Sequence, residues 1–550
     1  MRLLQLFILF IGLNSINGCV SQTEPALPKQ PSSAMTDNIS QLALEKSKAL
    51  GEKGKEFEQK QQYDEAVILT RQAIFKAQEA ARSDGLVLFI RWQWQLGRIF
   101  KAQGKINQAI VAYQQALQVL VPEGTFRWEM KEYGMPGEVS LYQELRHFFF
   151  QLADLLLQRA ATETNPAKKQ HDLRQARKTI EHLKQADVEN YFGNCVTAFQ
   201  KNGKRLDEIQ DARTAVIYPI LLAERLELLV SFPNQEASST LHRFSVPVGL
   251  DTVREEVRQF REQLDVGYLQ PKSTSFKRNA QQLYSWLIEP LEHQLSQQGI
   301  DTLVFVPEGV LHTIPMAALY DGNQFLMENF AVAITPGLSL TAPKADRLIS
   351  DNLQALLGGI TMETQGYPKL LYAPFEIEKI SQLYSHSDRL LNEQFTETEL
   401  TKALNNQDYS LVHFISHAEF ADNAAQSFMV TFDGTLTLEE LATLIQPTQQ
   451  RKTPIELLTL SACNTAEGDN EWAALGLSGM AVKAGARSVL ATLWKAHDET
   501  TYHLITRFYK ALEDKKSKAQ ALQSAQKDLL DSSYHHPFYW APLVLIGNWL

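Results

Sequence analysis

The sequence has few cysteines and no excess of basic charge. Three cysteines in 550 residues cannot form a disulfide framework, and the spacing of Cys19, Cys195 and Cys463 matches no Cys-x-x-Cys metal site. A formal net charge of −10 provides no field that attracts phosphate backbones, which argues against nucleic acid as a primary partner. By contrast, 44% hydrophobic and 21% charged residues are typical of globular proteins, so several folded domains are expected.

The amino terminus has an apolar stretch too short to span a bilayer, which takes about 20 residues. Arg2 precedes the apolar residues 3–11, and small residues lead to Cys19. This order predicts a secretory signal. The residues Ile16-Asn17-Gly18-Cys19 resemble the bacterial lipobox, although Asn17 departs from its usual small residue. The resemblance implies lipidation of Cys19 and a membrane-anchored envelope lipoprotein facing the periplasm. The alternative is an uncleaved anchor or a misplaced start, with Cys19 an ordinary buried thiol.

Helical periodicity begins near Ile39, and small residues recur where two antiparallel helices must approach closely. The pattern resembles the tetratricopeptide repeat, which implies a concave surface that binds a protein partner. Two amphipathic runs, 142–159 and 168–186, complete the expected array. The alternative is a spacer that covers a neighbouring core. The residues that carry the resemblance are Leu96, Gly97, Phe100, Gly104, Ala109, Tyr113, Ala116, Leu117 and Pro122, with Gly54, Phe57, Ala66 and Ala73 at similar offsets upstream.

After about residue 210, short aliphatic runs alternate with helical stretches. Strands separated by helices predict an α/β fold, a mostly parallel sheet flanked by helices. In such a sheet, sites form beyond the carboxyl ends of the strands. The expected strands are 215–222, 227–231, 241–248, 302–307, 354–360, 410–416, 456–461, 488–493 and 542–546.

Two of these strands end in reactive residues. The apolar run 411–416 leads to His417, and the run 457–462 leads to Cys463, 46 residues further on. A caspase-type dyad has the same order, with a histidine about 50 residues before the cysteine. The spacing therefore predicts a cysteine–histidine pair at one end of the sheet.

Several separated motifs resemble the CHAT domain, a caspase-like family of clan CD cysteine peptidases that is often fused to tetratricopeptide repeats. The resemblance covers about residues 210–550 and implies a caspase-like fold with His417 and Cys463 as the catalytic dyad. Ala418 replaces the glycine that usually follows the histidine. The motifs are Ser416-His417-Ala418 and the stretches 460–468, 485–494 and 539–543, with 306–315 and 335–337 before them.

The chemistry follows from the thiol. Only a few per cent of a free cysteine is thiolate at neutral pH, but the position of Cys463 between a strand and a helix would favour the anion. His417 would protonate the leaving amine and then activate water. The backbone amides of Ala418 and Cys463 are the candidates for the oxyanion hole. An alanine at this position costs about 1 kcal/mol or more if its φ angle is positive.

Acidic residues near the nucleophile are candidates for a pocket that receives an arginine or lysine of the substrate. Asp498 is the first candidate, with Glu467 and Asp469 as alternatives and Ser461 on the nucleophile strand. Each of the acidic residues can equally face solvent. His413 lies on the same strand face as His417, but no third ligand at usable spacing supports a metal site. No cofactor is expected.

The sequence thus predicts an exported cysteine endopeptidase of caspase-like type, with helical repeats that recruit or sense a protein partner. Two alternatives stay open: an inactive scaffold for protein–protein interaction, and hydrolysis or acyl transfer on a non-protein amide. The expected segments are a signal peptide (1–18), a flexible tether (19–37), a helical repeat domain (38–205), an amino-terminal part of the CHAT domain (206–350) and a catalytic part (351–550).

Overall fold

The structure is a computed structural model, and the chain divides into two compact units, Met1–Trp92 and Gln93–Leu550. The signal peptide, Cys19, Cys195, Cys463, Glu467 and Asp469 lie outside the described residues. None of the described helices is both long enough and apolar enough to cross a membrane. The structure describes residues 33–80, 83–122, 141–192, 213–233, 240–341, 353–421, 423–446, 455–462, 476, 479, 483–494 and 497–550.

The first unit is helical and is built around a close approach at Gly51. Its elements are α2 (Ser33–Gln59), α3 (Tyr63–Glu79) and the start of α4 (Ser83–Ala102). A methyl group on Gly51 would lie 2.2 Å from the indole of Trp92, so only glycine lets α4 pack this closely on α2. The indole donates a hydrogen bond to Ser47 Oγ (3.0 Å), which donates to the carbonyl of Ala73 (2.8 Å). Trp92 is thus part of the interhelical core.

The second unit begins with the rest of α4 and continues with α5 (Ile106–Leu120), α6 (Leu141–Thr162) and α7 (Pro166–Phe192). The last two include the predicted amphipathic runs. A methyl group on Gly97 would meet the ring of Tyr113 at 2.4 Å, which explains the small residue at this position of the repeat-like pattern. The Tyr113 hydroxyl donates to Gln151 Oε1 of α6 (2.5 Å). The all-helical region is confirmed, whereas the predicted domain boundaries stay predictions.

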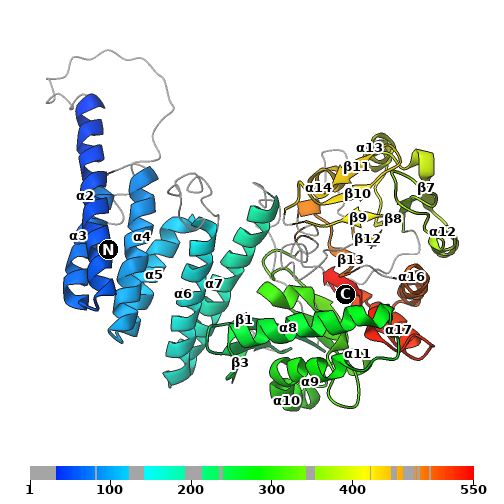
Figure 1. Cartoon of the computed structure of the whole chain (residues 1–550), viewed down its shortest axis with the longest axis horizontal. Helices are drawn as coiled ribbons and strands as arrows, with labels where there is room; N and C mark the ends of the chain where they lie inside the picture. Colours follow the sequence, from blue (N-terminus) through cyan, green and yellow to red (C-terminus); the bar gives the residue numbers. More distant parts are fainter. Residues whose placement is uncertain are drawn as a thin grey trace, which may run out of the picture. The chain divides into compact units, whose positions relative to one another are not determined.

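An eleven-stranded sheet forms the centre of the rest of this unit, in the order β3-β2-β1-β4-β5-β14-β13-β12-β8-β6-β7. Figure 1 labels β1, β3, β7, β8, β12 and β13 of this sheet. Strands β1, β4, β5 and β14 run parallel to one another, as do β13, β12, β8, β6 and β7. Because β13 and β14 pair antiparallel, the two groups run in opposite directions. The predicted mostly parallel sheet is therefore confirmed within each half.

Nine of the eleven strands of this sheet agree closely with the predicted aliphatic runs, whereas β5 and β7 were not predicted. Pro219 lies in β1 and has no amide hydrogen to donate to a neighbouring strand. The pairing of β1 with β4 ends two residues earlier, at Ile217, so this ladder loses no hydrogen bond at Pro219. The strands are β1 (Thr214–Leu221), β2 (Leu226–Ser231), β3 (Leu241–Val246), β4 (Thr302–Phe305), β5 (Ala331–Ile334), β6 (Ala355–Gly359), β7 (Ser387–Leu391), β8 (Leu411–Ser416), β12 (Leu457–Ala462), β13 (Ser488–Thr492) and β14 (Leu543–Gly547).

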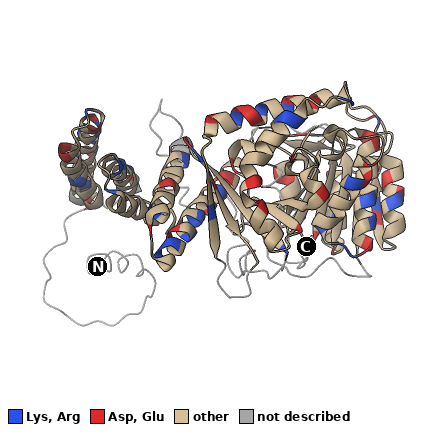
Figure 2. Cartoon of the chain, turned by 90° about the horizontal axis from the view of Figure 1, so that it is seen from below, with Lys and Arg blue, Asp and Glu red and all other residues tan. Residues whose placement is uncertain are grey.

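Helices pack on the sheet, and a small second sheet, β9 (Ala418–Glu419), β10 (Phe428–Val430) and β11 (Thr435–Thr437), follows β8. Lys and Arg occur beside Asp and Glu along the described helices (Figure 2), which agrees with the absence of a basic field in the sequence. The helices are α8 (Leu250–Asp265), α9 (Phe276–Leu287), α10 (Glu292–Gln297), α11 (Leu326–Asn329), α12 (Ala373–Leu383), α13 (Glu397–Asn406), α14 (Leu438–Ile445), α16 (Asp498–Glu513), α17 (Lys518–Leu530) and α18 (Pro537–Trp540).

Candidate active site

The strands that lead to the two predicted catalytic residues are direct neighbours. β8 and β12 pair in parallel, and the last pair in their register is Ser416 with Ala462. All residues of β8 are buried, as expected for a parallel strand that is covered on both faces. His417 and Cys463 directly follow this pair in the sequence. Cys463 lies outside the described residues, so the dyad stays a prediction.

The imidazole of His417 is held by a loop that the sequence analysis did not identify. Its Nε2 lies 2.8 Å from the carbonyl oxygen of Pro368. Because a carbonyl oxygen only accepts, Nε2 carries the hydrogen and Nδ1 is the basic nitrogen of the neutral ring. Within the described part of the chain, no hydrogen bond occupies Nδ1. The ring therefore has one nitrogen fixed and the other ready to accept a proton.

Tyr367 completes the support of His417. The two rings are stacked, with centroids 5.0 Å apart and planes at 24°. The Tyr367 hydroxyl donates to Glu419 Oε1 at 2.7 Å, and this bond raises the pKa of Tyr367 to about 12. The tyrosine thus stays neutral and links the strand after His417 to the loop that holds its ring. No repeat, spacing or charge pattern in the sequence distinguishes Tyr367 or Pro368.

Ala418 fits its position without backbone strain. It begins β9 and pairs with Met429 of β10. The backbone amide of Val430 donates to the carbonyl of His417 (2.8 Å), which fixes the chain at this point. Ala418 is not among the described non-glycine residues with a positive φ angle, so the cost considered for a positive φ angle does not arise. Its role in an oxyanion hole stays a prediction.

The described pocket candidates have structural contacts of their own. Ser461 is buried in β12. Asp498 begins α16, and its Oδ2 accepts a hydrogen bond from the backbone amide of Tyr372, just before α12 (3.0 Å). One oxygen of Asp498 therefore ties α16 to α12, and its role in substrate recognition stays a prediction.

Behind the end of β8, His413 belongs to a buried network that joins four elements. Its Nε2 lies 3.0 Å from Glu376 Oε1 of α12, and its Nδ1 lies 3.2 Å from the Tyr509 hydroxyl of α16. That hydroxyl also bonds Thr459 of β12 (2.8 Å). Burial raises the pKa of Tyr509 well above its usual value. Both nitrogens of His413 thus have protein partners, and no cluster of three metal-ligating side chains occurs among the described residues.

Two of the motif segments contact the helices instead of His417. The carboxylate of Glu308, in the segment 306–315, pairs with Arg146 of α6 and with Lys184 of α7. Near the segment 335–337, the backbone amides of Leu338 and Ser339 donate to the carboxylate of Glu181 on α7 at 3.1 and 2.9 Å. These segments therefore fasten α6 and α7 to the strand ends of β4 and β5.

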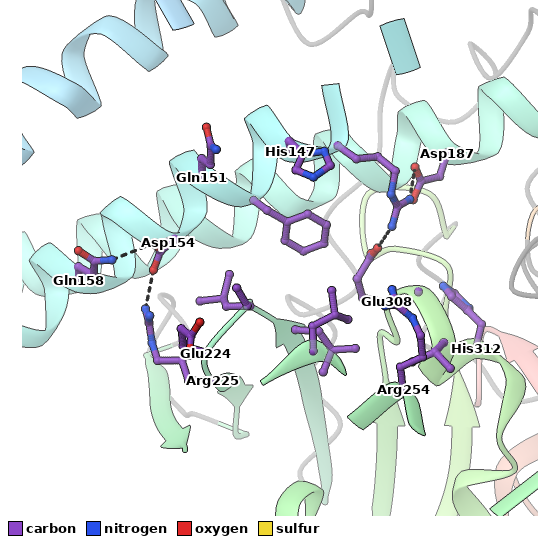
Figure 3. Close-up of a pocket in the computed structure, with 18 of the residues that line it drawn as sticks. His147, Gln151, Asp154, Gln158, Asp187, Glu224, Arg225, Arg254, Glu308 and His312 are labelled. Carbon is purple, nitrogen blue, oxygen red and sulfur yellow. Dashed lines mark hydrogen bonds and ion pairs between the residues drawn. The ribbon is translucent and has the colours of Figure 1, made fainter. Parts of the chain in front are cut away.

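A cleft of about 910 Å³ lies between α6 and the ends of β1 and β4 (Figure 3). Its wall contains Phe150 and Leu222, and Asp154 is bound to Arg225 at 2.8 Å. His312 also lines it and is 7% exposed. None of the residues that line the cleft belongs to β8 or β12, so it is separate from the predicted catalytic residues.

Residues 277–548 match the family model of the CHAT domain, a narrower stretch than the residues 210–550 of the sequence resemblance. The chain is also similar to a chain in the crystal structure of the Saccharomyces cerevisiae separase–securin complex, with a TM-score of 0.47 and 10% identity. That comparison covers 93% of this chain and 48% of the yeast chain, so this chain spans about half of its length. No curated protein matches the chain. Residues 277–548 of this chain therefore form a CHAT domain.

Proposed function

We propose that the CHAT domain is a cysteine peptidase of caspase-like type, with Cys463 as nucleophile and His417 as general acid and base. The observation that carries the proposal is the state of His417: its Nε2 donates to the carbonyl of Pro368, which leaves Nδ1 for proton transfer. This histidine directly follows the β8 residue that pairs with Ala462, and Ala462 precedes Cys463. Proximity of a fixed base to a thiol is what nucleophilic catalysis by cysteine requires.

In the proposed reaction, Nδ1 of His417 takes the proton of the Cys463 thiol, and the resulting thiolate attacks the carbonyl carbon of the scissile peptide bond. The protonated imidazole of His417 transfers its Nδ1 proton to the leaving amine as the C–N bond breaks. The neutral ring then takes a proton from water, which attacks the thioester and releases the acid. Throughout, the carbonyl of Pro368 accepts from Nε2 and stabilises the imidazolium by a charge-assisted hydrogen bond.

The second candidate is a scaffold without catalytic activity. Its main support in the sequence is Ala418, because a glycine in this position can adopt backbone angles that an alanine cannot. Ala418 is in an extended strand and needs no such angle, so this support is weak. A non-protein amide as substrate is compatible with the same residues and is decided by assaying the same variants on non-peptide amides.

The test compares the full-length wild type with Cys463→Ala and His417→Ala on a mixed peptide library at several pH values. His293→Ala, at an exposed histidine of α10, is the control. We expect cleavage by wild type and control and a loss of about 100-fold or more in both site variants, the usual contribution of a general acid or nucleophile. Equal turnover by all four proteins excludes the peptidase. The same four proteins are also assayed on non-peptide amides. If the two site variants lose activity only on these compounds, the substrate is a non-protein amide.

We also propose that the protein is an envelope lipoprotein anchored through Cys19, and that its helical region binds a protein partner. The basis for the anchor is the amino-terminal sequence alone. Mass spectrometry of the mature amino terminus tests it: a diacylated Cys19 supports the anchor, and an intact Met1 excludes it. Sensitivity of processing to globomycin is the second measurement.

A further inference from the structure

The carboxyl end of α7 contacts the segments that follow both predicted catalytic residues. Tyr191 and Phe192 are the last two residues of α7. Both are almost fully buried. One set of their partners, between Ala421 and Ser427, begins four residues after His417. The other set, between Gly476 and Lys483, begins 13 residues after Cys463.

The Tyr191 side chain fixes the segment after His417. Its hydroxyl lies 2.9 Å from Ser427 Oγ and 3.2 Å from the carbonyl of Ala421. The carbonyl of Tyr191 accepts from the backbone amide of Ala424 at 3.3 Å. Ser427 in turn accepts from the amide of Ala421 (2.8 Å), so the turn is closed around the phenol. Three hydrogen bonds from one helix residue thus hold the chain that leads from β9 to β10.

The same helix end packs against the helical residues after Cys463. A methyl group on Gly476 would lie 2.3 Å from the Tyr191 hydroxyl, and one on Gly479 would lie 2.6 Å from the Phe192 ring. Lys483 donates to the carbonyl of Phe192 at 3.1 Å and lies 5.2 Å from the centre of its ring. The spacing 476, 479 and 483 places these three residues on one helix face. This face therefore packs against the carboxyl end of α7.

The α7 helix is itself anchored upstream. Glu181 accepts from the amides of Leu338 and Ser339, and the Lys184 ammonium contacts Glu308 at 3.4 Å. These contacts are within three turns of Tyr191, so a single rigid helix connects the ends of β4 and β5 with the segments after His417 and Cys463.

We propose that Tyr191 and Phe192 are positioning residues of the CHAT peptidase, which hold the chain between Ala418 and Ser427 and the helix face of Gly476, Gly479 and Lys483 in the arrangement that catalysis needs. The inference rests on the proposed function for its catalytic consequence. The described contacts of the two residues are with Ala421, Ala424, Ser427, Gly476, Gly479 and Lys483, and none of them is with His417. The helical region before the CHAT domain is then part of the scaffold of the active site, in addition to any partner that it binds.

The test uses the full-length chain with Tyr191→Phe, which removes the hydroxyl and keeps the ring. The matched control is Tyr113→Phe, which removes a buried hydroxyl bonded to Gln151 within the helical region. Tyr191→Phe loses the contacts of the hydroxyl with Ser427 and Ala421 and keeps the backbone bond to Ala424. We expect it to lower kcat about five- to tenfold, with KM unchanged. Tyr113→Phe keeps the wild-type kcat.

Two measurements separate positioning from general stability. Hydrogen exchange of the peptide 418–427 is faster in Tyr191→Phe than in Tyr113→Phe at equal melting temperature. The second measurement is the pH profile of Cys463 alkylation by iodoacetamide, followed by mass spectrometry. In Tyr191→Phe the midpoint of this profile rises toward the pKa of a free thiol, about 8.5. If Tyr191→Phe unfolds, Phe192→Leu replaces it, because it removes the ring next to Lys483 and leaves the hydroxyl bonds intact.

The proposal is overturned if exchange of 418–427 and the alkylation profile of Cys463 are the same in both variants. Failure of the proposed function has a different result: turnover is then unaffected by Cys463→Ala, while exchange and alkylation still report on Tyr191. The two hypotheses therefore fail independently.

Discussion

His413 Nε2 lies 3.0 Å from Glu376 Oε1, and the two side chains are 0% and 3% exposed. The contact joins β8, the strand that leads to His417, to the helix α12. The bond from His413 to Tyr509 and the bond from Tyr509 to Thr459 add α16 and β12. The two strands that lead to the predicted dyad therefore share one buried polar network.

Removal of the Glu376 carboxylate takes away the partner of the buried His413 Nε2. We expect Glu376→Ala to lower the free energy of unfolding by about 2–4 kcal/mol, because His413 loses its only carboxylate partner in the described structure. Urea denaturation measures the loss. The control is Glu378→Ala on the same helix, whose exposed ion pair with Arg389 is worth about 1 kcal/mol or less. Equal losses in the two variants would contradict the role of the network.

Local patterns predicted most of the strands because they are short apolar runs, as in the residues 411–416 and 457–462. The strands β5 and β7 were not predicted; β7 is partly exposed and contains Ser387, Asp388 and Arg389. The order and spacing of the reactive residues predicted that they lie at one end of the sheet, and the pairing of β8 with β12 agrees with this prediction. The opposite directions of the two halves of the sheet were not predicted, since they depend on how β14 returns between β5 and β13.

The contacts of single side chains in the site could not be predicted either. Pro368 contacts His417 only through its backbone carbonyl oxygen. Every residue has such an oxygen, so the residue type does not indicate this contact. Tyr191 lies 226 residues before His417, and only the fold brings its helix to Ala421. Asp498 was singled out as an acidic residue near the nucleophile, but its bond to the amide of Tyr372 follows from the packing of α16 on α12.

The sheet has no room for a side chain at Gly358. A methyl group there would lie 2.6 Å from the Phe395 ring and 3.0 Å from the Phe414 ring. We expect Gly358→Ala to lower the free energy of unfolding by about 1–3 kcal/mol through overpacking between β6 and β8. Gly434→Ala, where nothing lies within 4 Å, is the control and stays near the wild-type value. A wild-type urea midpoint for Gly358→Ala would show that the two rings move aside freely.

Acid weakens the fold at the cleft beside α6. Burial lowers the pKa of His312 to about 3 from 6.5, an effect that Lys184 strengthens and Glu308 opposes. Between these pH values the unfolded chain binds a proton that the native chain does not, so stability falls as the pH decreases from about 6.5. Burial alone would raise the pKa of Glu308, but the charges of Arg146 and Lys184 lower it to about 2, which adds a loss below pH 4.5.

The variant His312→Gln isolates the histidine. Between pH 6 and pH 5 we expect its stability to fall less steeply than that of the wild type, by up to about 1.4 kcal/mol per pH unit for one proton. Urea midpoints at half-unit steps measure the slope. His293→Gln, at the exposed histidine of α10, serves as control with the wild-type slope. Parallel curves for wild type and His312→Gln would show that the proton taken up belongs to another group.

Asp498 allows a structural role to be separated from recognition of a basic substrate residue. Asp498→Asn keeps an oxygen that accepts from the amide of Tyr372 but removes the charge, whereas Asp498→Ala removes both. If the carboxylate binds an arginine or lysine of the substrate, kcat/KM for such peptides falls about tenfold or more in Asp498→Asn, because a charge-assisted bond is lost. For peptides with leucine at that position, kcat/KM of Asp498→Asn stays at the wild-type value, as does the melting temperature of this variant.

Asp498→Ala additionally lowers the melting temperature, since the Tyr372 amide loses its acceptor. Fluorogenic peptides that differ only at this position measure the ratio, and an equal loss for arginine and leucine peptides would confine Asp498 to tying α16 to α12.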